Sequence, residues 1–395
     1  MKSVQCCVLG LAVLLLAGCG AAVKQSAPPG SGGTVATPAA WTGGQSAEQV
    51  QADWLLAFND PLMLELIAEG QANNRDLQVA VGNMDKAWLL ARQAGVGLKP
   101  TADLSLGGGE SGGFEGGGSD SDFNVALQVS WELDLWGRIS AGVSEAEARA
   151  QAAEADYQFA LHSLSANIAR TYFKAIEAGL QVVIARRNLA ILQKTMRITQ
   201  VKYDSGLTSA QDVALNRADV ASAEEQLIQL EGSQRDVARA LEVLLGRYPQ
   251  AAIDTAMELP ELPAGPPAGL PSAALERRPD LIAAERQIAA AFDATHQARV
   301  ARLPKISLTG GVNGASGALS DLLNPANLIW QLGANLVAPL MDGGKRKIDI
   351  EIATVEQKQA ISNYAQKALA AFSEVENGLD LGQVLAERAV ALTEA

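Results

Sequence analysis

Within the stretch Asp122–Ile139, hydrophobic and polar residues alternate strictly from Phe123 to Leu135. Side chains that repeat with a period of two lie on alternate faces of a β-strand, so one face would be apolar and the other polar. From Ser140 the sequence is rich in Ala, Glu and Arg and has no glycine before Gly179, which predicts a long helix directly after the strand. The apolar set is Phe123, Val125, Leu127, Val129, Trp131, Leu133 and Leu135, and the polar set is Asn124, Ala126, Gln128, Ser130, Glu132 and Asp134.

Helical stretches are expected on both sides of this strand. Trp54–Lys99 has Asp60-Pro61 as a start signal and Pro100 as a stop. Ser140–Tyr203 would be a helix of about 64 residues, on the order of 95 Å long at 1.5 Å per residue. No globular core is that deep, so this helix must belong to an elongated structure.

A tight turn should follow the long helix. Gly206 is placed at the C′ position that ends a helix, and Thr208 and Ser209 precede Gln211 and Asp212 in two overlapping capping boxes. The next helix carries a heptad pattern that favours coiled-coil packing, and it ends near Gly246 and Pro249. The heptad positions are Val213, Val220, Leu227, Gln234 and Leu241, and Asn216, Ala223, Leu230, Val237 and Leu244.

The second half of the sequence repeats the first. Asp76 and Pro100 recur as Asp280 and Pro304, and Gly137 and Tyr157 recur as Gly344 and Tyr364. Alternation recurs in residues 101–109, 304–312 and 328–340, so four strands are expected in all. The counterpart of Tyr203 would be residue 410, so we expect the second helical hairpin to be absent from this sequence, which ends at Ala395. The expected divisions are a first repeat at 53–258, with helix, two strands and a long helical hairpin, and an incomplete second repeat at 259–395.

Residues 1–18 have one early cation, Lys2, and an apolar run, which predicts a secretory signal peptide. Leu16–Cys19 resembles a bacterial lipobox, which implies cleavage before Cys19 and lipidation of its thiol. The alternative is an ordinary signal peptide with an incidental cysteine. Gly20 in place of an aspartate implies that nothing retains the product at the inner membrane. Residues 19–52 would then be a lipidated N-terminal tether rich in Gly, Pro, Ser and Thr.

Composition excludes several classes of protein. The net charge of −13 and the lack of a basic stripe argue against a nucleic-acid partner. The three cysteines are Cys6, Cys7 and Cys19, and the two histidines, His162 and His296, lie in helical stretches, so no metal site is expected. The glycine-rich segment 107–118 lacks the Lys-Ser/Thr ending of a phosphate loop and is interpreted as a hairpin loop. No catalytic set stands out, since Glu132 and Asp134 are explained as polar-face strand positions, and we expect no enzyme activity and no cofactor.

Four strands of this length with one apolar and one polar face fit a transmembrane β-barrel. Four strands cannot close a barrel, and an open sheet has edges that lipid cannot satisfy, so other copies must complete it. Three copies give twelve strands and a conducting lumen, which favours a homotrimer. The fold class is therefore α+β, with a long α-helical coiled-coil barrel continuous with the β-barrel and with an internal duplication.

The motifs together resemble the TolC/OprM family of outer-membrane efflux lipoproteins, the outer membrane factors of RND tripartite pumps. The resemblance extends from the lipobox to the end of the sequence. The motifs are Leu16–Cys19, Asp53–Ile67, Ser130–Ile139, Lys202–Val213, Leu241–Pro249, Leu275–Gln287, Arg302–Gly311, Ala338–Gly344 and Ser373–Leu379.

This resemblance implies a passive channel subunit that conducts drugs and other small molecules out of the periplasm, with a periplasmic adaptor protein and an inner-membrane RND transporter as partners. It also implies a protein that is lipid-anchored in the outer membrane, in contact with outer-membrane lipid, and that extends into the periplasm. The helix turn would contact the adaptor through Tyr203, Gly206, Leu207 and Asp212. The membrane-facing strand residues would be Phe123, Val125, Leu127, Val129, Trp131 and Trp330.

Two other functions remain open at this point. A type I protein secretion duct shares the fold. A periplasmic coiled-coil scaffold lipoprotein that never spans the membrane would share the helices, although the four alternating strands argue against it.

Overall fold

The computed structural model describes residues 37–42, 54–112, 120–256, 258–263, 269 and 271–394, without the side chains of Ala274 and Glu394. The chain divides into two units, Met1–Ala36 and Thr37–Ala395, and the description below concerns the second. The predicted signal peptide and Cys19 lie outside the described residues.

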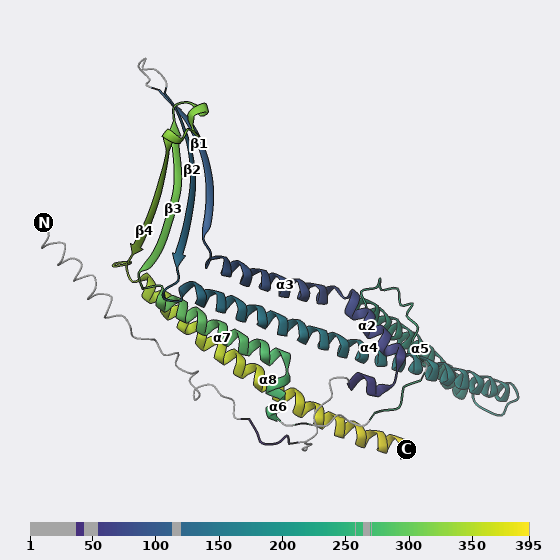
Figure 1. The fold of residues 1–395 in the computed structure, drawn as a ribbon. Helices are drawn as coiled ribbons and strands as arrows, with labels where there is room; N and C mark the ends of the chain where they lie inside the picture. The colour runs from purple at the N-terminus through teal and green to yellow at the C-terminus, as the bar shows by residue number, and fades with distance from the viewer. Residues whose placement is uncertain are drawn as a thin grey trace. The chain divides into compact units, whose positions relative to one another are not determined.

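In the described residues of the first half, the helical part consists of four helices and a short 3-10 turn (Figure 1). The turn η1 (Trp54–Phe58) precedes α2 (Pro61–Asn73) and α3 (Arg75–Val96). The two long helices are α4 (Arg138–Asp204) and α5 (Ala210–Leu244). Asp60 caps α2 by accepting from the Met63 N–H, with Pro61 in the first turn, as the sequence predicts. The sequence did not predict the break at Asn74, whose side chain caps α3 and also donates to the Leu244 carbonyl at 2.9 Å.

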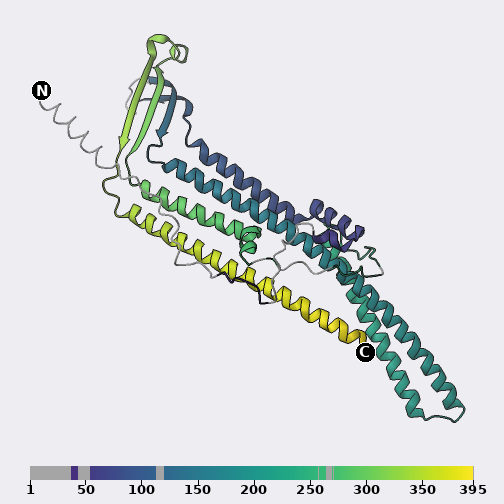
Figure 2. The same ribbon diagram turned by 60° about the horizontal axis from the view of Figure 1, so that its bottom comes forward.

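The second half contributes α6 (Pro271–Arg277), α7 (Pro279–Val300) and α8 (Lys345–Glu394). Helix α7 packs against both α4 and α8, so the two halves of the chain meet along the α4–α7 contact. Figure 2 shows α4, α7 and α8 running side by side, with the α4–α5 hairpin extending beyond them. Within the described ranges, no helix is both long enough and apolar enough to cross a membrane.

The sheet has four antiparallel strands in the order β1-β2-β3-β4. These are β1 (Thr101–Ser111), β2 (Asp120–Leu133), β3 (Lys305–Ser316) and β4 (Leu328–Val337), and two 3-10 turns, η2 (Leu319–Asp321) and η3 (Pro325–Asn327), lie between β3 and β4. The central pair, β2 and β3, joins strands from the two halves of the chain. Strands β1 and β4 are therefore left with one unpaired edge each.

The main hydrophobic core lies where α2, α3, α4 and α5 meet. Tyr172 of α4 is fully buried there, and its hydroxyl donates to Asp60 Oδ2 at 2.9 Å. The buried Glu242 of α5 accepts from the N–H groups of Ala251 and Ala252 at 2.7 and 2.8 Å, which fastens the segment after α5 to the helix. The core residues are Met63, Leu66, Ile67, Leu77, Leu164, Ile168, Ala169, Tyr172, Ile176, Leu241 and Leu245.

Candidate functional site

The strand register places apolar and polar side chains on opposite faces of the whole sheet. Partners across strands share a face, so each pairing extends the alternation of β2 to its neighbours. The apolar rows are Ala102–Val129–Gly310–Leu332, Leu104–Leu127–Val312–Trp330, Leu106–Val125–Gly314–Leu328, Trp131–Leu308–Ala334 and Leu133–Ile306–Leu336. The polar rows include Thr101–Ser130–Thr309–Gly333, Asp103–Gln128–Gly311–Gln331 and Ser105–Ala126–Asn313–Ile329.

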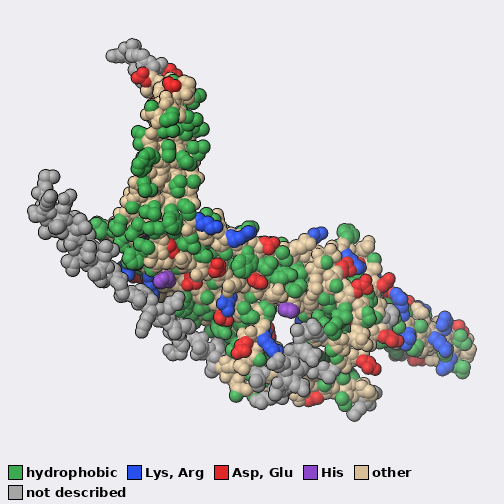
Figure 3. All heavy atoms as spheres, viewed as in Figure 1, with side chains coloured by type: hydrophobic (Ala, Val, Ile, Leu, Met, Phe, Trp, Pro, Cys, Tyr) green, Lys and Arg blue, Asp and Glu red, His purple; other side chains and the backbone are tan. Residues whose placement is uncertain are grey.

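In a single chain, many apolar side chains on the strands are exposed to solvent. Leu106 of β1 is 72% exposed, and Trp330 and Leu332 of β4 are 77% and 80% exposed. Figure 3 shows hydrophobic side chains along the length of the strands. All six residues predicted to face the membrane lie on this apolar face. They are Phe123, Val125, Leu127, Val129, Trp131 and Trp330. Their contact with lipid stays a prediction.

The junction between β2 and α4 is a helix cap that the sequence did not reveal. Strand β2 ends at Leu133, so Asp134 is not a strand position as predicted: its carboxylate accepts from the N–H groups of Ile139 and Ser140 at 2.8 and 2.7 Å. Burial raises the pKa of Asp134, but hydrogen bonds from the Ser140 hydroxyl and these two N–H groups, with the charge of Arg138, outweigh it and hold the pKa below its usual range. Glu132 is a strand position as expected, and it pairs with Arg138 at 2.8 Å.

Further contacts fix the β2–α4 connection, and similar ones fix the connection from β4 to α8. Gly137 adopts a φ of 72°, which lets the chain turn from strand to helix, and Gly344 before α8 has a φ of 89°. Asp342 accepts from the Gly344 N–H at 3.0 Å and pairs with Arg346. The indole of Trp136 donates to the Pro304 carbonyl at 2.7 Å, which ties α4 to the start of β3.

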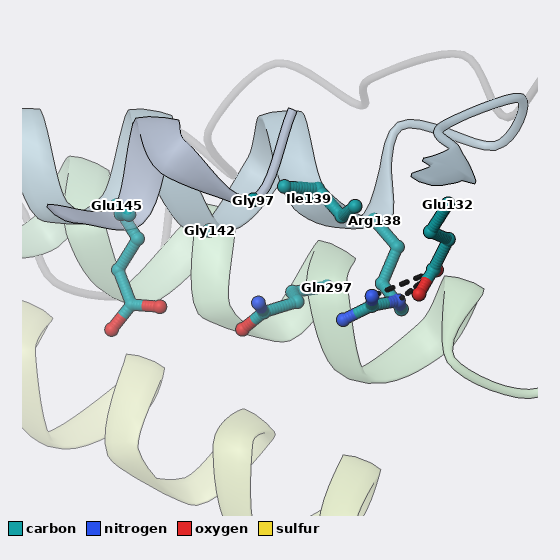
Figure 4. Close-up of a pocket in the computed structure, with 8 residues that line it drawn as sticks. Gly97, Glu132, Arg138, Ile139, Gly142, Glu145 and Gln297 are labelled. Atoms are coloured by element: carbon teal, nitrogen blue, oxygen red, sulfur yellow. Dashed lines mark hydrogen bonds and ion pairs between the residues drawn. The ribbon is translucent and has the colours of Figure 1, made fainter. Parts of the chain in front are cut away.

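A shallow cleft of about 370 Å³ opens beside this junction. In Figure 4, Glu145 and Glu132 lie at its two ends, with Gln297 and Arg138 between them. The described parts of the chain bring together no three His, Cys, Asp or Glu side chains that could hold a metal ion. The lining residues are Ala94, Gly97, Glu132, Arg138, Ile139, Gly142, Glu145 and Gln297.

The α4–α5 turn has the predicted Gly206 and one of the two predicted capping boxes, that of Ser209 and Asp212, while the Thr208 hydroxyl donates to Asp212. Gly206 has a φ of 73°, the Leu207 N–H donates to the Lys202 carbonyl at 2.8 Å and the Gly206 N–H to the Tyr203 carbonyl at 2.9 Å, which is a Schellman motif. Hydrogen bonds from the Thr208 and Ser209 hydroxyls hold the pKa of Asp212 below its usual range.

Ser209 and Asp212 form a capping box at the start of α5. Side chains of Tyr203 and Leu207 are exposed beside the turn, and Leu207 is 76% exposed. The four predicted tip residues, Tyr203, Gly206, Leu207 and Asp212, are therefore brought together, and their contact with a partner stays a prediction.

Comparison with known proteins identifies the family. A family model described as "Outer membrane efflux protein" matches residues 66–247 and 270–395. The chain belongs to the outer membrane efflux protein family. It is 32% identical over 339 residues to the cation efflux system protein CusC of Escherichia coli K12, covering 85% of this chain and 74% of CusC. It is 31% identical over 390 residues to the pyoverdine export outer membrane protein OpmQ of Pseudomonas aeruginosa, covering 93% of this chain and 80% of OpmQ.

The fold of this outer membrane efflux protein is that of solved channels. The open-state structure of the MtrE outer membrane channel of Neisseria gonorrhoeae matches with a TM-score of 0.83 at 25% identity, covering 93% of this chain and 84% of MtrE. The predicted fold class, long helices joined to a four-stranded β domain, is confirmed by this match and by the strands themselves. The predicted function as an outer-membrane efflux channel protein and the outer-membrane location are confirmed at the level of the family.

Proposed function

We propose that this outer membrane efflux protein acts as a homotrimer whose sheets close into a twelve-stranded transmembrane β-barrel. The observation that carries the proposal is one apolar face that continues across all four strands, on a sheet whose two outer strands each keep an unpaired edge. Unpaired backbone groups are not tolerated in lipid, so β1 of one copy would pair with β4 of the next. Strand β1 and strand β4 run in opposite directions, so this pairing would be antiparallel like the others.

The polar face would then line a water-filled lumen. Thr101, Gln128, Asn313 and Gln331 belong to the rows that would face it. Helices α3, α4, α7 and α8 would continue the duct as a tunnel wall into the periplasm, since each strand connects directly to one of them. A duct of this kind needs no catalytic group and no cofactor, so we propose passive conduction.

The α4–α5 turn would be the docking point for a periplasmic adaptor, which would connect the duct to an inner-membrane RND transporter. Support comes from the exposed Tyr203 and Leu207 on a turn held rigid by two capping motifs. The cargo would be small molecules or ions, because OpmQ is described as exporting pyoverdine and CusC as a cation efflux protein. We further propose lipidation of Cys19, which would anchor the N-terminus to outer-membrane lipid.

Gel mobility and conductance of the same preparation test the proposed duct. The purified, detergent-extracted chain is run unheated and heated on a denaturing gel and then incorporated into a planar bilayer. We expect a heat-sensitive band at about three times the mass of the heated chain, and discrete conductance steps. Monomers at every temperature and no conductance would contradict the duct and favour a periplasmic scaffold.

A further inference from the structure

The polar face of the sheet carries few ionisable groups, and their positions are uneven. Among the described strand residues, Asp120 and Asp122 lie at the loop end of this face, and Glu132 and Lys305 at the helix end. Glu132 is already paired with Arg138. Between the two ends the one ionisable side chain of the described strands is Asp103 of β1.

The row that contains Asp103 is otherwise uncharged. Asp103 lies opposite Gln128, which pairs in turn with Gly311, and Gly311 pairs with Gln331. The Asp103 carboxylate is exposed, and the described residues give it no ion-pair partner. A larger residue at position 311 would have to displace the backbone, because a Cβ added to Gly311 would lie 2.8 Å from the Leu127 carbonyl oxygen. The row therefore carries one negative charge per chain, beside the neutral amides of Gln128 and Gln331.

We propose that Asp103 sets the charge selectivity of the duct, by forming a ring of three carboxylates that favours cations over anions. The proposal rests on the trimeric barrel proposed above, with the polar face turned inward. Rings of aspartate or glutamate side chains are a general device for cation preference in pores. No binding site is required, because the ring acts through its electrostatic potential on ions that pass.

The dimensions decide whether such a ring can act across the lumen. Twelve strands about 4.8 Å apart and tilted by about 40° enclose a ring roughly 24 Å across between backbones. The centre then lies about 12 Å from each backbone and nearer to each carboxylate. The Debye length is about 10 Å at 0.1 M salt, about 30 Å at 0.01 M and about 3 Å at 1 M. The whole cross-section therefore feels the ring at 0.1 M, more strongly at 0.01 M and hardly at 1 M.

The test is the reversal potential of single channels in a KCl gradient, with K⁺ and Cl⁻ as the probes. We expect the wild-type chain to prefer K⁺, and Asp103→Asn to lower the K⁺/Cl⁻ permeability ratio by about five-fold near 0.1 M and by little near 1 M. Glu110→Gln is the matched control. It also removes one negative charge from β1, but Glu110 lies on the same face as Leu104 and Leu106, so the ratio should stay unchanged.

A second variant separates charge from folding. Asp103→Cys should lower the K⁺/Cl⁻ permeability ratio as Asp103→Asn does, a negatively charged thiosulfonate reagent should restore the ratio, and a positively charged one should lower it further. The wild-type chain treated alike is the control, since its cysteines are Cys6, Cys7 and Cys19. Channels that conduct with the same ratio in wild type, Asp103→Asn and labelled Asp103→Cys would overturn the proposal and leave the duct intact. A wild-type chain that does not conduct would overturn both the duct and the ring.

Discussion

The helical core around Tyr172 and the four-stranded sheet use the same kinds of apolar side chain in opposite ways. In the core, Met63, Ile168 and Tyr172 are each 0% exposed, so one chain completes their burial. In the sheet, Trp330 and Leu332 are more than three-quarters exposed. Burying a side chain of this size away from water is worth about 1.5–3 kcal/mol. The core is therefore stabilised within one chain, whereas in the proposed duct lipid and neighbouring copies would complete the burial of the sheet.

The largest effect is expected from a charge on the apolar face of the sheet. Leu127→Arg should abolish membrane-inserted trimers, because an arginine facing lipid at mid-membrane costs about 2–4 kcal/mol in every copy. Gln128→Arg, one residue along β2 on the polar face, is the matched control and should assemble. Heat-sensitive trimers in outer-membrane fractions are the measurement. If the two variants formed the same amount of heat-sensitive trimer, the assignment of one face to lipid and the other to the lumen would be contradicted.

The core should respond to truncation of its largest side chain. Tyr172→Ala should lower the free energy of unfolding of the helices by about 3–5 kcal/mol, since it leaves a cavity where α2, α4 and α5 meet. Tyr172→Phe should cost about 1 kcal/mol, through loss of the hydrogen bond to Asp60. Urea unfolding followed by helical circular dichroism measures both. A cost of Tyr172→Ala no larger than that of Tyr172→Phe would mean that this site is not packed as described.

Alkaline pH provides a milder probe of the same core. Burial, followed by the hydrogen bond to Asp60 and its negative charge, raises the pKa of Tyr172 to about 12. A raised pKa means that the folded state favours the protonated hydroxyl, so its contribution is complete below pH 10 and is lost as pH rises toward 12. Thermal unfolding of the helices should therefore show a decline above pH 10 that is smaller in Tyr172→Phe. Identical pH profiles would show that Tyr172 does not titrate with folding.

Two glycines that end helices should differ in how much an alanine costs. Both have positive φ, 73° at Gly206 and 76° at Gly246, which by itself costs a non-glycine residue about 1–2 kcal/mol. An added Cβ meets nothing within 4 Å at Gly206 but lies 2.6 Å from the Asn73 carbonyl oxygen at Gly246. Gly246→Ala should therefore destabilise the helices more than Gly206→Ala in urea unfolding. A larger loss of stability in Gly206→Ala than in Gly246→Ala would contradict the close contact between Gly246 and Asn73.

A variant at Gly206 tests partner binding separately from stability. Gly206→Ala should cost less stability than Gly246→Ala yet reduce binding of the adaptor in co-purification, because the proposed contact depends on the conformation of the turn. If Gly206→Ala bound the adaptor as well as the wild-type chain does, the predicted adaptor contact at this position would be contradicted.

Much of this fold could be predicted from the sequence because the signals are local. Asp60, Gly206 and Ser209 cap helices through contacts within a few residues, and the alternation along β2 assigns its two faces directly. At Asn74 a local cap, in which the Leu77 N–H donates to the Asn74 side chain, is joined by a distant contact with the Leu244 carbonyl that the sequence does not indicate. The Asp134 cap is local, but the alternation continues past Leu133 and hides where the strand ends. The Trp136 bond to Pro304 joins residues 168 positions apart. Long-range contacts leave no periodic trace in the sequence.

The measurement that tests the central claim most directly is solvent accessibility along β2 in reconstituted vesicles. Single spin labels at consecutive positions from Phe123 to Trp131 are exposed to oxygen, which concentrates in lipid, and to a water-soluble nickel complex. The account predicts a period of two: oxygen contact at 123, 125, 127, 129 and 131, and nickel contact at 124, 126, 128 and 130. Uniform access to the nickel complex at all nine positions would contradict a strand that divides lipid from an aqueous lumen.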